Sequence, residues 1–179
     1  MSAAIAIRPA GFEDLAALFA YLGEQLAENG RDGVLFQPLA PTSAGVPEAM
    51  RERFAAGVAT PVGQPGWRQV WIALDAAGGI AGHVDLRGRD AAAPHRVLLG
   101  MGVRRDLRRA GLGTRLVQTA LGGARAMPGV EWVDLEVLSQ NHKARALYVR
   151  MGFHVTGEVP DRYRIGGMSV GEVAMSFRL

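Results

Sequence analysis

Two glycines in the segment from Arg108 to Thr114 most constrain the fold, because they join a strand pattern to a helix pattern. The apolar residues 97–103 precede this segment, and apolar residues recur after it at the spacing of one helical face. The first turn of a helix carries unpaired N–H groups and a partial positive charge, so it attracts anions. Glycine also lets a phosphate group approach the backbone closely. The order strand, glycine turn, helix therefore predicts a turn that binds a diphosphate.

Two other glycine-rich phosphate motifs fit this segment less well. A P-loop has Lys and then Ser or Thr after its second glycine, whereas Gly113 is followed by Thr114 and Arg115. A Rossmann turn has three glycines early in a βαβ unit and an acidic residue about 20 residues later. The segment here has two glycines and lies in the second half of the chain.

The composition is typical of a globular protein with one domain. The 179 residues are 49% hydrophobic and 21% charged, which suits a single domain over residues 1–179. Cysteine is absent, which excludes disulfides, thiolate nucleophiles and zinc–thiolate sites. No apolar run reaches the roughly 18 residues of a membrane helix, and residues 1–9 lack the pattern of a signal peptide. We therefore expect a cytoplasmic protein that does not enter a membrane.

The distribution of positive charge favours a small anionic ligand over a nucleic acid. The net charge is +3, and aromatic residues make up 7% of the chain. Nucleic-acid binding would need a basic stripe interleaved with aromatic side chains. The clustered arginines instead surround the glycine turn: Arg104, Arg105, Arg108, Arg109 and Arg115.

Hydrophobic periodicity and turn residues predict eleven elements. Five strands are expected at residues 5–9, 69–74, 80–86, 97–103 and 132–138, and two more within 153–179 around Gly166 and Gly167. Helices are expected at residues 13–28, 46–58, 111–126 and 141–151, with a long loop over 30–47. The order β-α-α-β-β-β-α-β-α-β-β predicts an α/β (α+β) fold, in which a mixed, mostly antiparallel sheet carries helices on both faces.

Two linked motifs resemble those of the GNAT (GCN5-related N-acetyltransferase) superfamily. Arg108, Gly111 and Gly113 match its Arg/Gln-x-x-Gly-x-Gly/Ala acetyl-CoA signature. Residues 141–153 are similar to its Asn-x-x-Ala-x-x-Leu-Tyr-x-x-x-Gly-Phe block. The C-terminal half is also similar to bacterial small-molecule and amino-acid acetyltransferases and to ribosomal-protein alanine acetyltransferases. The resemblance covers most of the chain and is weakest over residues 30–68.

The resemblance implies a set of residues that bind acetyl-CoA, a co-substrate that needs no metal. The strand before the turn would offer backbone groups to the pantetheine arm, and amides of the turn would hold the pyrophosphate. Asn141 would cap its helix and also donate to the cofactor. Glycines in residues 99–103 predict a bulge that splays this strand from residues 132–138 and opens a slot. The implied cofactor-binding residues are Met101, Gly102, Val103, Arg108, Arg109, Ala110, Gly111, Leu112, Gly113, Thr114 and Asn141.

The resemblance also implies direct attack of a neutral amine on the thioester in a ternary complex. Tyr148 would protonate the departing thiolate, and the amide near Val103 would hold the oxyanion. Several relatives place a Glu base on the strand before the turn, but residues 96–103 contain no carboxylate. Glu136 is the best substitute as the base, because the block around it looks like that of ribosomal-protein alanine acetyltransferases. A solvated or salt-bridged Glu136 is the plain alternative, and Asp85, His83 or a water molecule are further candidates for the base.

The resemblance implies that the acceptor is selected by the first two helices, their loop and the C-terminal hairpin, here residues 13–58 and 160–172, which carry the least signal. An amino acid or another small primary amine is favoured, with Arg162 or Arg164 paired to a substrate carboxylate. Polyamines would need an acidic pocket, for which Glu24, Glu28 and Glu48 are candidates.

Other functional classes remain open at this point. They are a protein N-terminal or lysine acetyltransferase, a non-catalytic acyl-CoA sensor, and a structural module whose turn binds nothing. Many relatives dimerise, but nothing in the sequence fixes a homodimer.

Overall fold

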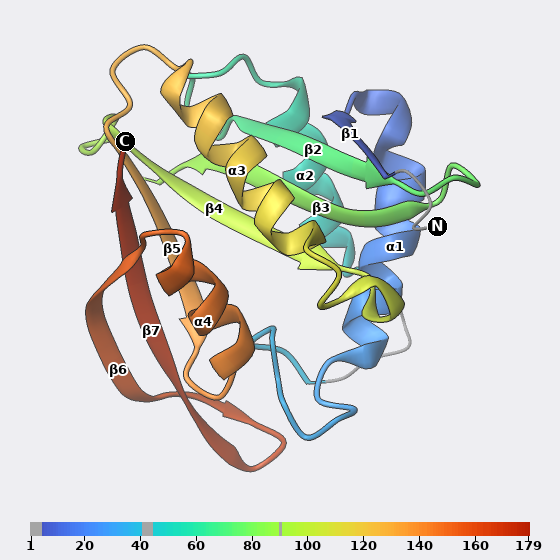
Figure 1. The fold of residues 1–179 in the computed structure, drawn as a ribbon, viewed down its shortest axis with the longest axis vertical. Coiled ribbons are helices and arrows are strands. Elements are labelled where there is room, and N and C mark those ends of the chain that lie inside the picture. The colour runs from blue at the N-terminus through green and yellow to red at the C-terminus, as the bar shows by residue number, and fades with distance from the viewer. Residues whose placement is uncertain (1–4, 41–44, 90) are drawn as a thin grey trace.

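A computed structural model describes residues 5–40, 45–89 and 91–179, so parts of residues 1–9 and of the predicted 30–47 loop lie outside the described residues. The elements follow the predicted order (Figure 1). The strands are β1 (Ala6–Pro9), β2 (Arg68–Leu74), β3 (Ile80–Gly88), β4 (Arg96–Val103), β5 (Trp132–Leu138), β6 (His154–Ile165) and β7 (Met168–Arg178). The helices are α1 (Leu15–Glu28), α2 (Glu48–Ala59), α3 (Leu112–Arg125) and α4 (His142–Arg150), with 3-10 turns at Phe12–Asp14 and Arg105–Leu107.

The strands form one sheet in the order β1-β2-β3-β4-β5-β7-β6. All neighbouring strands are antiparallel except β4 and β5, which are parallel. The predicted mixed, mostly antiparallel sheet is therefore confirmed. A parallel pair needs a crossover connection, and α3 provides it between β4 and β5.

Helices cover both faces of this sheet, as the sequence predicts. In Figure 1, α3 and α4 lie in front of the strands, and α1 and α2 lie behind them. The apolar stripe of α3 packs on one face of β2 to β5, while α1 and α2 pack on the opposite face of β2 and β3. The buried stripe of α3 consists of Leu112, Leu116, Val117, Ala120, Leu121 and Ala124. None of the described helices is both long and apolar enough to cross a membrane.

β4 and β5 separate in the middle of the sheet. Three residue pairs join them, from Arg96 opposite Trp132 to Leu98 opposite Asp134, and both strands then continue without pairing to each other. The predicted splay is confirmed. The predicted bulge is wrong, because β4 keeps an uninterrupted register with β3 over its whole paired length. The glycines of β4 instead make room for side chains of β3, described below.

Candidate active site

The glycine turn presents a row of unpaired backbone amides. Arg109 and Gly111 have left-handed backbone angles, with φ of 68° and 81°. Gly111 is the N-cap of α3 and offers no side chain to cap it. Within the described residues, the amides of residues 109–114 donate no hydrogen bond. Six consecutive free donors at a helix start are an arrangement suited to binding an anion.

The two glycines of the motif have different structural roles. Gly111 adopts the left-handed conformation that turns the chain into α3. Gly113 lies against α4, because a Cβ atom on it would come within 3.1 Å of Leu147 Cδ2. The spacing Gly-x-Gly therefore sets the turn and also seats α4 beside the first turn of α3.

The arginines near the turn are mostly engaged by the protein itself. Arg108 donates from Nε to the Val103 carbonyl at 2.9 Å, and its NH2 lies 3.2 Å from Glu28 Oε2 on α1. Arg104 pairs with Asp75 and Asp106, and Arg105 pairs with Asp32. Arg109 makes no ion pair with any described residue. Arg109 is thus the arginine next to the unpaired amides whose charge is not neutralised by a described residue. Arg108 instead connects the turn to α1.

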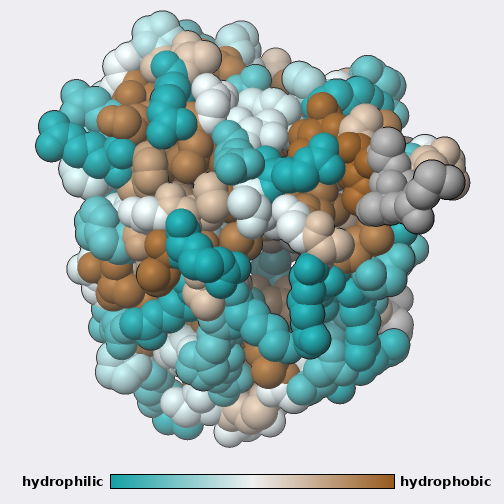
Figure 2. All heavy atoms as spheres, viewed as in Figure 1, coloured by the Kyte–Doolittle hydropathy of each residue, from teal (hydrophilic) through white to brown (hydrophobic). Residues whose placement is uncertain are grey.

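The end of β4 has a second group of free backbone donors. The Arg104 amide donates to the Ala81 carbonyl of β3 at 2.9 Å. Amides of an antiparallel strand alternate in direction, so those of Met101 and Val103 point toward β5, which has already moved away. The amides of the sequence-predicted Met101 and Val103 therefore point into the gap between the strands, whereas that of Gly102 points toward β3. Figure 2 shows this face of the molecule hollowed near its centre, with hydrophilic residues around the hollow.

Asn141 and Tyr148 sit at the two ends of α4. The Asn141 side chain caps the helix by accepting from the Ala144 amide at 3.2 Å, as predicted. The Tyr148 ring is buried against Phe153, with 5.8 Å between ring centroids. Its hydroxyl makes no hydrogen bond to a described residue, and burial raises its pKa. Tyr148 is therefore a protonated hydroxyl at neutral pH with its donor unused.

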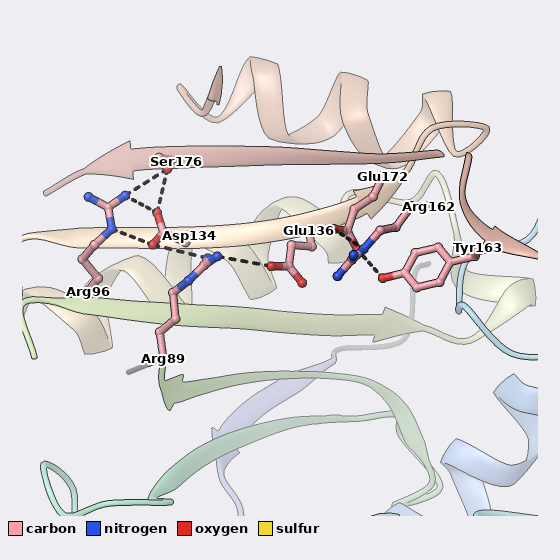
Figure 3. Close-up of polar contacts among 8 residues, drawn as sticks. All are labelled: Arg89, Arg96, Asp134, Glu136, Arg162, Tyr163, Glu172 and Ser176. Atoms are coloured by element: carbon pink, nitrogen blue, oxygen red, sulfur yellow. Dashed lines mark hydrogen bonds and ion pairs between the residues drawn. The ribbon is translucent and has the colours of Figure 1, made fainter. Parts of the chain in front are cut away.

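The opposite face of the sheet carries charged side chains instead of free backbone. Figure 3 shows Asp134 and Glu136 on β5 with Arg96 and Arg89. Arg96 Nε donates to Asp134 Oδ2 at 2.8 Å, and Arg89 NH2 lies 3.4 Å from Glu136 Oε1. Burial would raise the pKa of Asp134, but hydrogen bonds from Arg96 and Ser176 hold it below its usual range. Asp134 is a buried structural anion, whereas Glu136 is 40% exposed and has one weak partner.

The two other candidate bases lie on β3, on this same face. Asp85 is buried and accepts from Arg68 and Arg87. His83 is buried too, and burial lowers its pKa to about 4, so its ring is neutral at pH 7. The His83 ring meets the Tyr21 ring of α1 edge-on, with 5.5 Å between centroids. The Nδ1 atom of His83 and the hydroxyl of Tyr21 are both enclosed without a hydrogen-bond partner in the described residues.

The family follows from comparison with known proteins. Residues 45–153, more than half of the chain, match the family described as the acetyltransferase (GNAT) family. The chain belongs to that family. This GNAT protein is therefore an acyltransferase, and the resemblance seen in the sequence is confirmed. A search of curated proteins finds no significant match.

Solved structures share the fold of this GNAT protein over nearly its whole length. A GNAT-family acetyltransferase from Streptococcus pneumoniae is 23% identical, with 98% of this chain and 100% of that chain covered and a TM-score of 0.81. A phosphinothricin acetyltransferase from Sinorhizobium meliloti, solved in complex with acetyl-CoA, is 19% identical, with 100% and 89% covered and a TM-score of 0.79. The protein yncA from Salmonella typhimurium, solved with its cofactor acetyl-CoA, is 18% identical, with 98% and 94% covered and a TM-score of 0.78.

The other candidates for acceptor binding fall into two groups in this GNAT structure. Arg162 lies 3.8 Å from Glu172, whose carboxylate also accepts from the Tyr163 hydroxyl (Figure 3), so Arg162 faces the charged side of the sheet. Arg164 instead pairs with Asp161 in the β6–β7 hairpin and is largely exposed.

Two of the three glutamates proposed for an acidic pocket pair with arginines. Glu28 pairs with Arg108, and Glu48 lies near Arg51 on α2. Glu24 lines a shallow hollow together with Glu28, Arg104, Arg105 and Asp106.

Sequence reasoning missed several charged residues of this face. Arg68 and Arg87 are neighbours because β2 and β3 pair with Arg68 opposite Arg87. Alternation along β3 puts His83, Asp85 and Arg87 on one face, so this signal was present once residues 80–86 were assigned to a strand. Glu172 reaches the site through its pairing opposite Leu138, which no local pattern indicates.

Proposed function

We propose that this acetyltransferase moves the acetyl group of acetyl-CoA to the primary amine of a small molecule, most simply an amino acid. The observation that carries the proposal is the separation of β4 and β5 directly beside six unpaired turn amides. That arrangement would place the slot for the cofactor arm directly next to the amides that would bind its pyrophosphate. The acetyl-CoA complexes of the Sinorhizobium and Salmonella structures support this choice of donor.

The residues that would hold acetyl-CoA are mainly backbone donors. Amides of Arg109–Thr114 would hold the pyrophosphate, with the Arg109 side chain adding charge. Backbone groups of Met101, Gly102 and Val103 would pair with the pantetheine arm as a strand would. Asn141 stands where α4 begins, and its side-chain nitrogen Nδ2 makes no hydrogen bond to a described residue, so it can donate to the same arm.

The reaction would be a direct transfer. The amine nitrogen attacks the acetyl carbonyl carbon, and the Val103 amide stabilises the oxyanion that forms. Glu136 takes the proton that the attacking nitrogen loses. The C–S bond then breaks, the carbonyl re-forms, and Tyr148 donates its proton to the departing thiolate. The raised pKa of Tyr148 keeps that proton in place until the thiolate appears.

The charges near Glu136 support an acceptor that bears both an amine and an acid. The carboxylates of this face are Asp85, Asp134, Glu136 and Glu172, and the arginines that contact them are Arg68, Arg87, Arg89, Arg96 and Arg162. Five cations against four anions give no acidic pocket for a polyamine. Arg89 and Arg162 are partly exposed, and their contacts with carboxylates are 3.4 Å or longer, so they can turn toward a substrate carboxylate.

The test is release of CoA thiol from acetyl-CoA with a panel of amino acids, polyamines, aminoglycosides and N-terminal peptides. We expect an amino acid to raise the rate well above background hydrolysis. A peptide as the best acceptor would favour the protein N-terminal alternative. Binding of acetyl-CoA without turnover for any acceptor would favour the sensor alternative, and no binding would overturn the proposal.

A further inference from the structure

Asp85, Gly100 and Glu136 lie in one row across the sheet. Asp85 is opposite Gly100 in the antiparallel pair of β3 and β4. On the other side of β4, Leu98 is opposite Asp134 in the parallel pair, so Gly100 and Glu136 are each two residues further, where the strands part. All three face away from α3, because the alternate residues Leu99 and Leu135 belong to the core beneath that helix. Two carboxylates thus flank a position that has no side chain.

The Asp85 carboxylate has one engaged oxygen and one free oxygen. Oδ1 accepts from Arg68 NH1 at 3.0 Å and from Arg87 NH1 at 2.9 Å. Oδ2 makes no hydrogen bond to a described residue. Unlike the unpaired Nδ1 atom of His83, it is not fully enclosed by the protein. A Cβ atom on Gly100 would lie 2.7 Å from Oδ2 and 2.9 Å from Arg87 NH1, so both groups of this ion pair lie over the glycine. The two arginines therefore hold the carboxylate with its free oxygen directly over β4.

The two ion pairs of Asp85 use Oδ1 and leave Oδ2 without a hydrogen bond from the described part of the chain. Arg68 already stacks on Phe54, with its guanidinium 3.8 Å from the ring centroid, so its position does not depend on Asp85 alone. A carboxylate kept over a glycine with an unused oxygen is suited to a ligand that donates hydrogen bonds and carries positive charge.

We propose that Asp85 Oδ2 binds the ammonium group of the acceptor above Gly100. The inference rests on the proposed function and names the residue that receives the amine. Neighbouring strands of a sheet lie about 4.8 Å apart, and β4 lies between the strands of Asp85 and Glu136. These two residues are therefore separated by about 10 Å or more, which leaves room for the amine between them. Asp85 binds the ammonium form, and the proton that the amine loses passes to Glu136 through water that bridges the gap. The acetyl thioester comes from the slot on the other side of β4.

The first test measures binding and needs no turnover. Ethylammonium chloride is titrated into the isotope-labelled full chain at constant ionic strength, and the amide resonances of Gly100 and Gly102 are followed by NMR. We expect saturable shifts whose apparent Kd rises at least tenfold in Asp85→Asn and less than threefold in Glu136→Gln. Either the absence of a saturable shift in the wild type or an unchanged Kd in Asp85→Asn would overturn the proposal.

A second variant keeps the test valid if Asp85→Asn does not fold. Gly100→Ala keeps both charges but places a methyl group 2.7 Å from Oδ2 and 2.9 Å from Arg87 NH1, so the carboxylate and the guanidinium must shift. We expect the same rise in Kd from it. Gly122→Ala on α3 is the matched control, because its Cβ would have no neighbour within 4 Å, and it should bind as the wild type does. Equal binding in Gly100→Ala and Gly122→Ala would contradict the proposal.

Kinetics separates this inference from the proposed function. With the best acceptor of the thiol-release panel, Asp85→Asn should raise the KM for the amine about tenfold or more and leave the KM for acetyl-CoA unchanged. A merely structural Asp85 would shift both. If the wild type shows no thiol release, the proposed function fails, and the NMR titration still decides whether Asp85 binds an ammonium group.

Discussion

The two sides of β4 differ in what they offer to a ligand. Toward α3 and α4, the free groups are backbone amides of residues 109–114, Met101 and Val103. Toward α1 and α2, they are side chains, among them Asp85 and Glu136. A site made of backbone amides can keep its ligand while most of its side chains change. A site made of side chains is specific to one acceptor, which is why the motif predicts the donor better than the acceptor.

Tyr148 is the exception to this comparison, since it is a side chain on the α4 side with a proposed chemical role. Tyr148→Phe removes the hydroxyl and keeps the ring that packs on Phe153. We expect kcat to fall by roughly 10²-fold or more, the usual contribution of one positioned acid, with the KM for acetyl-CoA nearly unchanged. Steady-state thiol release measures both, and a kcat within twofold of the wild type would assign the acid to another group.

His83 gives the charged face a pH-dependent stability that the amide side lacks. Its pKa is about 4 in the folded protein, against 6.5 for an ordinary histidine, because burial disfavours the cation. The unfolded chain therefore binds the proton first as the pH falls. The stability is complete above pH 6.5 and is lost as the pH falls toward 4, by about 2 kcal/mol between pH 7 and pH 5. Denaturant unfolding at both pH values measures this loss.

A variant identifies His83 as the source of that loss. His83→Gln cannot take up the proton, so its free energy of unfolding should change much less between pH 7 and pH 5. The Asp14 carboxyl, whose pKa the hydrogen bonds from Arg8 lower, titrates below this range and does not interfere. An equal loss in wild type and variant would mean that another group titrates there.

Glu136 tests whether the charged face supplies the base. Glu136→Gln should lower turnover by about tenfold at low pH, where most of the amine is protonated, and less at high pH, where free amine is abundant. Affinity for acetyl-CoA should hold, because Glu136 lies on the face away from the turn. A matched variant, Glu158→Gln, removes a carboxylate from β6 that pairs with Arg145, and its pH profile should equal that of the wild type. A pH-independent effect of Glu136→Gln would remove it from the mechanism.

How far the sequence could predict the site depends on the range of the contacts involved. The turn, the Asn141 cap and the element order rest on neighbours within a few residues, and local patterns found them. The bulge prediction failed because the glycines of β4 face Asp85 and His83 of another strand. Arg68 and Glu172 reach the site through strand register, which local propensity does not set. The described structure therefore adds most on the acceptor side.

Gly113→Ala makes the smallest change and tests the backbone side directly. The new methyl group would lie 3.1 Å from Leu147 Cδ2, so the Leu147 side chain of α4 must give by a few tenths of an ångström. We expect the KM for acetyl-CoA to rise by roughly tenfold, equivalent to about 1.4 kcal/mol, with little change in the KM for the amine. Isothermal titration with acetyl-CoA checks the same loss, and Gly122→Ala controls for adding a methyl group to α3. If Gly113→Ala changed the amine KM as strongly as the acetyl-CoA KM, the two sides of β4 would be one coupled site, and their division into a backbone side and a side-chain side would fail.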